Sequence, residues 1–208
     1  IIPPKVLMVV VDTSLLTQPE IDRKALLESL GCVVTLINNL ADKQDIEDAM
    51  ELNDVAYIPA HITVDKGGVM EKTTKGVVSE SKSFLPILGF SANSKGQNAT
   101  TIVVMNSSHY ITTPFSIGLL SISTTNGNMT TLNGSDAPGM DVLALVGLNE
   151  GLAVLETGAT RHDSVGSPGR LVKLPWGNAG IDINILKPSG KTLMQRSIEW
   201  AANLERPD

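Results

Sequence analysis

The chain has 208 residues, of which 42% are hydrophobic, 18% charged and 3% aromatic, and its formal net charge is −6 at pH 7. This length suits one folded unit with a sizeable core. An acidic chain without a lysine and arginine stripe excludes nucleic acid as the main partner. Because no run approaches about 18 apolar residues, membrane insertion of this segment is excluded too.

The first 60 residues alternate between apolar runs and amphipathic segments. Residues 5–12 form a nearly continuous, valine-rich run, typical of a strand buried on both faces. Residues 17–20 (TQPE) have the pattern of a capping box, and Gly31 follows where the resulting helix would end. Further strands are expected at residues 32–37 and 54–59, around a helix that begins after Asp42. This β-α-β-α-β order predicts an α/β fold with a doubly wound, mostly parallel sheet.

The remaining elements are expected to be shorter, and several are rich in threonine. Residues 67–82 are expected to form a weaker helix interrupted by Gly76, and residues 83–90 (SFLPILGF) a fourth strand. The later elements are expected to be strands at 101–105, 116–123, 129–132 and 170–174, a hairpin over 141–148 and 151–157, and a closing helix at 189–204.

Residues 91–135 differ sharply in composition from the segment before them. Residues 1–90 contain 21 charged side chains, whereas residues 91–135 contain one, Lys95, and 22 of these 45 residues are Ser, Thr or Asn. We therefore expect a single α/β domain over residues 1–208 that contains a low-charge, Thr/Ser-rich β insertion over residues 91–135. The prolines near both ends also predict that the domain is excised from a longer chain.

Four N-glycosylation sequons lie in this low-charge segment, and they predict an exposed face of a glycoprotein. We expect the protein to be extracellular or on the cell surface, with glycans as possible partners. The four sequon asparagines are Asn98, Asn106, Asn128 and Asn133.

Ser91 is the candidate nucleophile, since Gly89-Phe90-Ser91-Ala92-Asn93 follows the expected fourth strand, where α/β hydrolases hold a serine on a sharp turn. The second glycine of that motif is replaced by Asn93, so an ordinary polar turn is the alternative. His162 and His109 are the candidate bases. His61 follows the third strand, at the edge where doubly wound sheets bind ligands.

No cofactor and no metal site is predicted. The chain lacks the usual metal-ligand spacings and a dinucleotide-binding G-x-G-x-x-G. Its one cysteine, Cys32, lies at the start of an apolar strand, where a buried, inert thiol is expected.

In this order, the segments resemble the glutamine amidotransferase-like domains with a flavodoxin-like fold, including those called trehalose-utilisation-like. The matching segments are KVLMVVVDTS, VVTLINN, DVAYIPAH and SFLPILGFSAN, then residues 106–118, residues 169–177, and residues 190–202 with Trp200. The resemblance spans nearly the whole chain and implies the same fold.

The resemblance also implies that the chain lacks the catalytic cysteine of the family. Active members of that family carry a catalytic cysteine on the turn where Ser91 stands here, so ammonia transfer from glutamine is not expected. A related group of peptidase E-like serine hydrolases has Gly-x-Ser-Ala-Gly at this turn, one residue away from the sequence here. Domains of this type without the cysteine resemble non-catalytic modules of larger surface proteins.

These observations suggest three functions, of which we prefer the first. In the first, the chain is a non-catalytic structural module of a surface protein. It serves binding or self-assembly into a filament or array, with other copies or flanking domains as partners. The second function is a Ser91-dependent hydrolase. The third is a small-molecule binding domain around Thr13, Ser14, residues 59–61 and Ser91, in which Ser14, His61 and Ser91 are the candidate contacts.

Overall fold

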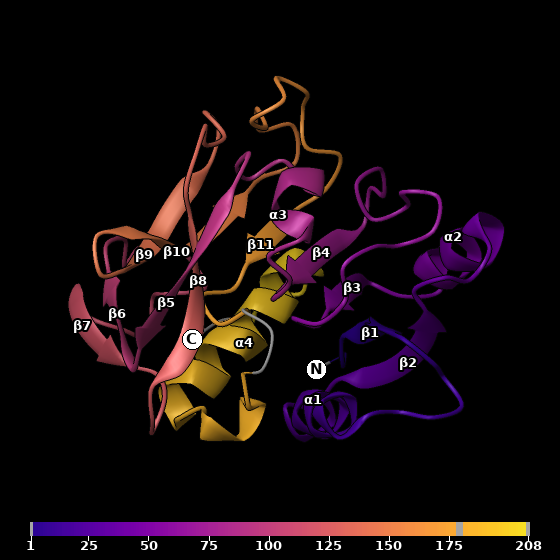
Figure 1. The fold of residues 1–208 in the computed structure, drawn as a ribbon, viewed down its shortest axis with the longest axis horizontal. Coiled ribbons are helices and arrows are strands. Elements are labelled where there is room, and N and C mark those ends of the chain that lie inside the picture. The colour runs from indigo at the N-terminus through magenta and orange to yellow at the C-terminus, as the bar shows by residue number, and fades with distance from the viewer. Residues whose placement is uncertain (1, 178–180, 207–208) are drawn as a thin grey trace.

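A computed structural model describes residues 2–177 and 181–206, and it shows an α/β fold (Figure 1). The strands are β1 (Lys5–Val10), β2 (Val33–Asn38), β3 (Val55–Ile58), β4 (Gly76–Ser79), β5 (Ser94–Ala99), β6 (Thr101–Val104), β7 (Gly118–Ser121), β8 (Gly127–Leu132), β9 (Asp141–Val146), β10 (Asn149–Leu155) and β11 (Leu171–Lys173). The helices are α1 (Gln18–Ser29), α2 (Lys43–Glu51), α3 (Phe84–Ile87), the 3₁₀ helix η1 (Ile183–Ile185) and α4 (Pro188–Ala201).

Nine strands form one central sheet in the order β2-β1-β3-β4-β11-β10-β9-β6-β7, and β5 pairs with β8 in a separate ribbon. The five strands from β2 to β11 are joined in parallel. The four pairings from β11 to β7 are antiparallel. The parallel sheet predicted from the sequence is therefore present, and an antiparallel half extends it.

Both faces of the parallel half are covered by helices. Alternate residues of β1 point to opposite faces, as the two-residue period of a strand requires. Val6, Met8 and Val10 join the apolar core that contains α1 and α4, whereas Leu7 and Val9 join the core that contains α2 and α3. This burial on both faces explains why β1 reads as an unbroken apolar run.

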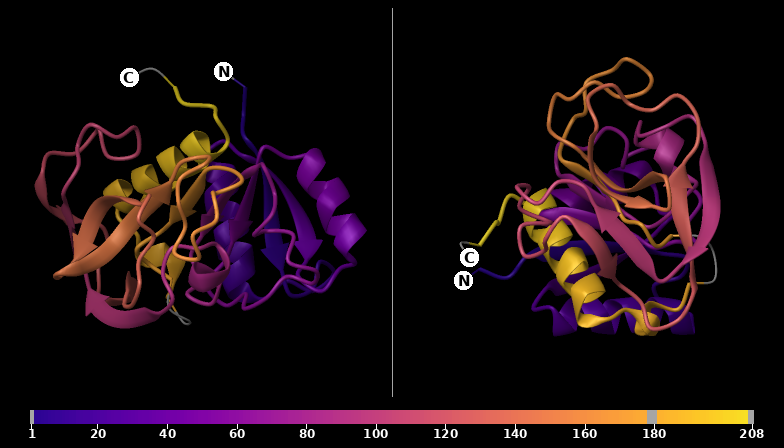
Figure 2. Two further views of the ribbon diagram at one scale, coloured as in Figure 1. Left: turned by 90° about the horizontal axis from the view of Figure 1, so that it is seen from above. Right: turned by 90° about the vertical axis from the view of Figure 1, so that its left-hand side faces the viewer.

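Helix α4 packs across both the parallel and the antiparallel half of the sheet. It packs against β4, β11 and β7, and Figure 2 shows it lying along the sheet beside the antiparallel strands. Gly76 in β4 permits this close approach, because a Cβ atom there would lie 2.0 Å from the carbonyl oxygen of Ala201. In the described part of the chain, no helix combines the length and apolar character needed to cross a membrane.

Two expected elements in the middle of the chain are wrong. The helix expected over residues 67–82 is replaced by a loop that leads into β4, and the strand expected over residues 83–90 is replaced by the short helix α3. The fourth parallel strand thus ends at Ser79, twelve positions before Ser91. Hydrophobic period alone does not distinguish a short apolar strand from a buried helical turn.

The low-charge segment supplies strands to both the sheet and the ribbon. Strands β6 and β7 continue the antiparallel half, while β5 and β8 form the ribbon. Lys173 of β11 links the ribbon to the sheet, because its side-chain nitrogen Nζ donates to the carbonyl oxygen of Thr130 in β8 at 2.6 Å and to that of Gly151 in β10. Lys173 is 1% exposed.

Candidate functional site

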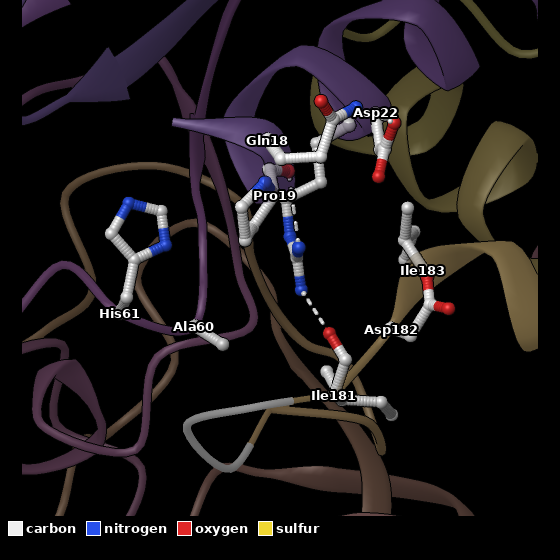
Figure 3. A pocket seen from close by; sticks show the side chains of 9 residues that line it. Gln18, Pro19, Asp22, Ala60, His61, Ile181, Asp182 and Ile183 are labelled. Carbon is white, nitrogen blue, oxygen red and sulfur yellow. Dashed lines mark hydrogen bonds between the residues drawn. The ribbon is translucent and has the colours of Figure 1, made fainter. Parts of the chain in front are cut away.

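A pocket of about 340 Å³ lies at the carboxyl edge of the parallel strands (Figure 3). Strands β1 and β3 are neighbours there, and the chain leaves them in opposite directions, toward β2 and toward β4. Open α/β sheets bind their ligands at such switch points. The pocket is lined by Gln18, Pro19, Asp22, Arg23, Ala60, His61, Ile181, Asp182 and Ile183.

A histidine–carboxylate pair stands on one side of the pocket. His61 Nε2 lies 3.0 Å from Glu20 Oε1, and the imidazole is 29% exposed. Glu20 itself is held by the backbone N–H groups of Val11 at 2.9 Å and Thr17 at 2.8 Å. Burial alone would raise the pKa of Glu20, but these hydrogen bonds and those from His61 and the Thr17 hydroxyl lower it. The carboxylate therefore stays ionised and fixes the orientation of the imidazole.

A buried ion pair forms the base of the pocket. Glu80, the first residue after β4, accepts from Arg23 Nε at 2.8 Å and from the backbone N–H of Ala60 at 3.3 Å. The other oxygen of Glu80 accepts from the Tyr57 hydroxyl and from Trp176 Nε1 at 3.2 Å. Burial and the Glu80 charge together raise the pKa of Tyr57 well above its usual value of 10. The buried carboxylate is thus fully hydrogen-bonded, as a buried charge must be.

The opposite side of the pocket carries two carboxylates. Asp22 comes from α1, and Asp182 precedes η1 and accepts from the backbone N–H of Asn184 at 2.9 Å. The Asn184 side chain donates to Asp22 at 3.1 Å, so Asn184 is hydrogen-bonded to both carboxylates. Figure 3 shows Asp22, Asp182 and Ile183 on the side of the pocket away from His61.

Of the three candidate binding residues, only His61 lines the pocket. Ser14 is exposed and bonds to Asp12 through both its N–H and its hydroxyl. Ser91 is buried outside the pocket, and its backbone forms an isolated antiparallel β-bridge with Asp136. Its hydroxyl has no hydrogen-bond partner among the described residues. Ser91 therefore does not contribute to the pocket that His61 lines.

The two candidate bases make their contacts with groups other than the Ser91 hydroxyl. His162 Nε2 lies 3.1 Å from the carbonyl oxygen of Pro86. His109 packs against the Trp200 ring at 5.0 Å, and burial lowers its pKa. Within the described ranges neither imidazole is hydrogen-bonded to Ser91. The nucleophile–base contact that a serine hydrolase needs is not formed in this structure.

Cys32 and the sequons lie away from the pocket. Burial raises the pKa of Cys32 to about 11, which matches the inert thiol expected from its position. Asn98 and Asn128 face each other in the β5–β8 register, and Asn98 is exposed. Use of the four sequons stays a prediction. Among the described residues, no group of three or more His, Cys, Asp or Glu is arranged to hold a metal ion.

Most of the residues that form the pocket were missed by sequence reasoning. Arg23, Asp22 and Asp182 lie in segments without a motif and meet through the tertiary fold. Glu80 did offer a signal, since it is a carboxylate directly after the apolar Gly-Val-Val-Ser of β4. An acid at the end of a buried parallel strand lies at the edge where ligands bind.

Comparisons with known proteins support the fold alone. No protein-family model and no curated protein matches the chain. A solved structure described as a cytoplasmic protein, STM3548 from Salmonella typhimurium, matches with a TM-score of 0.58 at 9% identity. The match covers 95% of this chain and 98% of that one.

That description contradicts the extracellular or cell-surface location expected from the sequence. Burial accounts for part of the low charge of residues 91–135. Five of the 16 Ser and Thr side chains in this segment are buried, at positions where charged residues would be costly. These five are Ser91, Thr112, Ser123, Thr130 and Thr131.

Proposed function

We propose that this chain is a non-catalytic binding domain that takes a small molecule in the pocket between α1, His61 and η1. The observation that carries the proposal is the convergence of three separate segments on one cavity of about 340 Å³ at the switch point of the sheet. Small-molecule sites are commonly clefts of about 300 to 1,000 Å³ with apolar walls and a few polar groups.

The residue after β4 supports a non-catalytic role. If the chain has the proposed flavodoxin-like, amidotransferase-like architecture, the turn after the fourth parallel strand is where active members carry their nucleophile. Here that turn carries Glu80, which is buried and bonded to Arg23. A carboxylate engaged in this way supports the structure of the pocket floor and is not available for attack on a substrate.

Filling the pocket is expected to abolish binding. Ala60 lines the pocket and is 7% exposed, so Ala60→Phe places an aromatic ring in the cavity. We expect fragments that shift the amide resonances of α1 and His61 in the wild-type NMR spectrum to bind Ala60→Phe at least about tenfold more weakly. Ala49→Phe, which fills a different pocket of about 330 Å³ beside β2, is the matched control and should leave binding unchanged. Fragments that bind Ala60→Phe as well as the wild type would contradict the proposal.

Self-association is the second candidate function, and the edge strand β7 favours it. β7 ends the nine-stranded sheet, and Ile117 and Leu119 on and beside it are 68% and 80% exposed. No charged residue lies between Ile117 and Ser121 to discourage pairing. Lys187 donates to the Ser121 hydroxyl at 2.7 Å and so covers the last residue of β7, which leaves Gly118 to Leu120 as an apolar template for another strand.

Leu119→Lys tests this second function. If two copies pair through β7, light scattering after size exclusion should show dimers or larger species for the wild type at about 100 µM. The variant should be monomeric, because a lysine on an edge strand opposes pairing. Leu148→Lys, at a turn residue that is 93% exposed, is the control. A monomeric wild type at every concentration would rule out this function.

A further inference from the structure

The pocket carries more negative than positive charge. Asp22 and Asp182 line it, and Glu20 and Glu80 lie directly behind it. Among the described residues, neither Asp22 nor Asp182 forms an ion pair. Of the described residues that line the cavity, Arg23 is the one with a permanent positive charge.

Arg23 does not compensate for the two acids. Its Nε donates to Glu80, and its two terminal nitrogens donate to the carbonyl oxygens of Pro19 at 3.2 Å and Ile181 at 3.3 Å. The Arg23 charge is therefore neutralised by Glu80. The Arg23 side chain lies against the pocket floor and is only 2% exposed. An anionic ligand would meet two carboxylates at the rim and only this neutralised pair beneath.

The start of α1 does not offer an anion site either. Pro19 has no N–H to donate, and the N–H of Glu20 bonds to the carbonyl oxygen of Thr17 at 3.0 Å. The N–H of Thr17 is taken by the Glu20 side chain. A helix start usually favours anions through free N–H groups, and most of those groups are occupied here.

The two acids are held in place but keep acceptor capacity. Asp22 accepts from Gln18 Nε2 at 2.8 Å and from Asn184 Nδ2 at 3.1 Å, and Asp182 accepts from the Asn184 N–H. An ionised carboxylate has about four acceptor positions, so each acid can accept a further donor. Pro19, Ala60, Ile181 and Ile183 supply apolar surface next to them.

We infer that the ligand is a small organic cation, an ammonium group on an apolar body. The ammonium would lie between Asp22 and Asp182, and the apolar body against Pro19, Ala60 and the isoleucines. This inference rests on the proposed function and names the class of ligand for the same pocket. A charged donor to two carboxylates forms shorter and stronger hydrogen bonds than a neutral donor does.

Three probes of one shape test the inference: benzylamine hydrochloride, benzyl alcohol and sodium benzoate, titrated by NMR at low salt. We expect benzylamine to bind in the pocket at least about tenfold more tightly than benzyl alcohol, and benzoate not to bind there. Raising the salt to 0.5 M should weaken benzylamine binding. Asp182→Asn and Asp22→Asn should each weaken it about fivefold, and the double variant more.

Asp48→Asn, on the exposed face of α2, is the matched control and should bind benzylamine as the wild type does. Benzoate or benzyl alcohol binding in the pocket as tightly as benzylamine would overturn the inference, and so would unchanged affinity in both pocket variants. The proposed function fails separately, when fragments of every charge type bind Ala60→Phe as they bind the wild type.

Discussion

Replacing Glu80 by glutamine is expected to lower the free energy of unfolding by about 3 to 5 kcal/mol. The substitution leaves the Arg23 guanidinium, 2% exposed, without its counter-charge in a water-excluded site. Urea unfolding followed by far-UV circular dichroism measures the effect. Fluorescence is unsuitable because Trp176 donates directly to Glu80, so its emission changes with the substitution itself.

Two comparisons separate loss of the ion pair from an ordinary surface effect. Glu47→Gln removes the partner of Lys43 in an exposed pair on α2, and we expect a change below about 1 kcal/mol. The double variant Arg23→Met/Glu80→Met removes both charges and should be more stable than Glu80→Gln alone. A Glu80→Gln protein within about 1 kcal/mol of the wild type would show that the pair contributes little.

The protein is expected to become more stable between pH 7 and pH 9 because of Lys173. Burial lowers the pKa of Lys173 to about 7 from its usual 10.5, with the Glu150 charge opposing the shift. Between these two values the unfolded chain holds a proton that the folded chain has released, so the free energy of unfolding rises with pH. The rise over this interval is about 2 kcal/mol, at 1.36 kcal/mol for each unit.

Lys173→Met is the control for this pH dependence. The methionine has a similar length and no titrating group, so the variant should lose the rise between pH 7 and pH 9. The measurement stops at pH 9 because burial raises the pKa of Cys32 from 9.0 to about 11. Above pH 9 the folded chain retains the Cys32 proton that the unfolded chain releases, and this offsets the contribution of Lys173. Equal slopes for wild type and variant would mean that the amine of Lys173 does not titrate in this range.

The sequence predicts the first five elements well because local and global signals agree there. β1 is an apolar run buried on both faces, the Glu20 arm of the capping box bonds to the Thr17 N–H, and Gly31 has a φ of +87° just beyond α1. Each signal is local in the chain and needs no knowledge of the tertiary fold.

The middle of the chain is mispredicted because its signals are ambiguous. Residues 83–90 are apolar enough for a strand, yet they form α3, in which Pro86 lies within the first turn and needs no N–H partner. β5 (Ser94–Ala99) has no alternation of apolar and polar residues, and it is a strand because it pairs with β8. Such pairing is a tertiary property that propensity does not encode.

The pocket is predictable only in part for the same reason. His61 is found from its place after β3, where the edge of a parallel sheet is expected. Asp182 lies more than one hundred residues further along and reaches the pocket only through the packing of η1 against α1. A tertiary contact between residues so far apart in the chain leaves no periodic signal in a single sequence.

The pairing of β4 with β11 also determines the order in which the protein can assemble. β4 and β11 are joined through Val77 and Leu171, so the chain between them closes a loop of more than ninety residues. A ribosome must synthesise that whole stretch before the edge of β4 finds its partner. Until then, four fully buried residues of β4 present an open, apolar edge. Folding that waits on such distant contacts is slow, and the emerging N-terminal half is most exposed to aggregation during this interval.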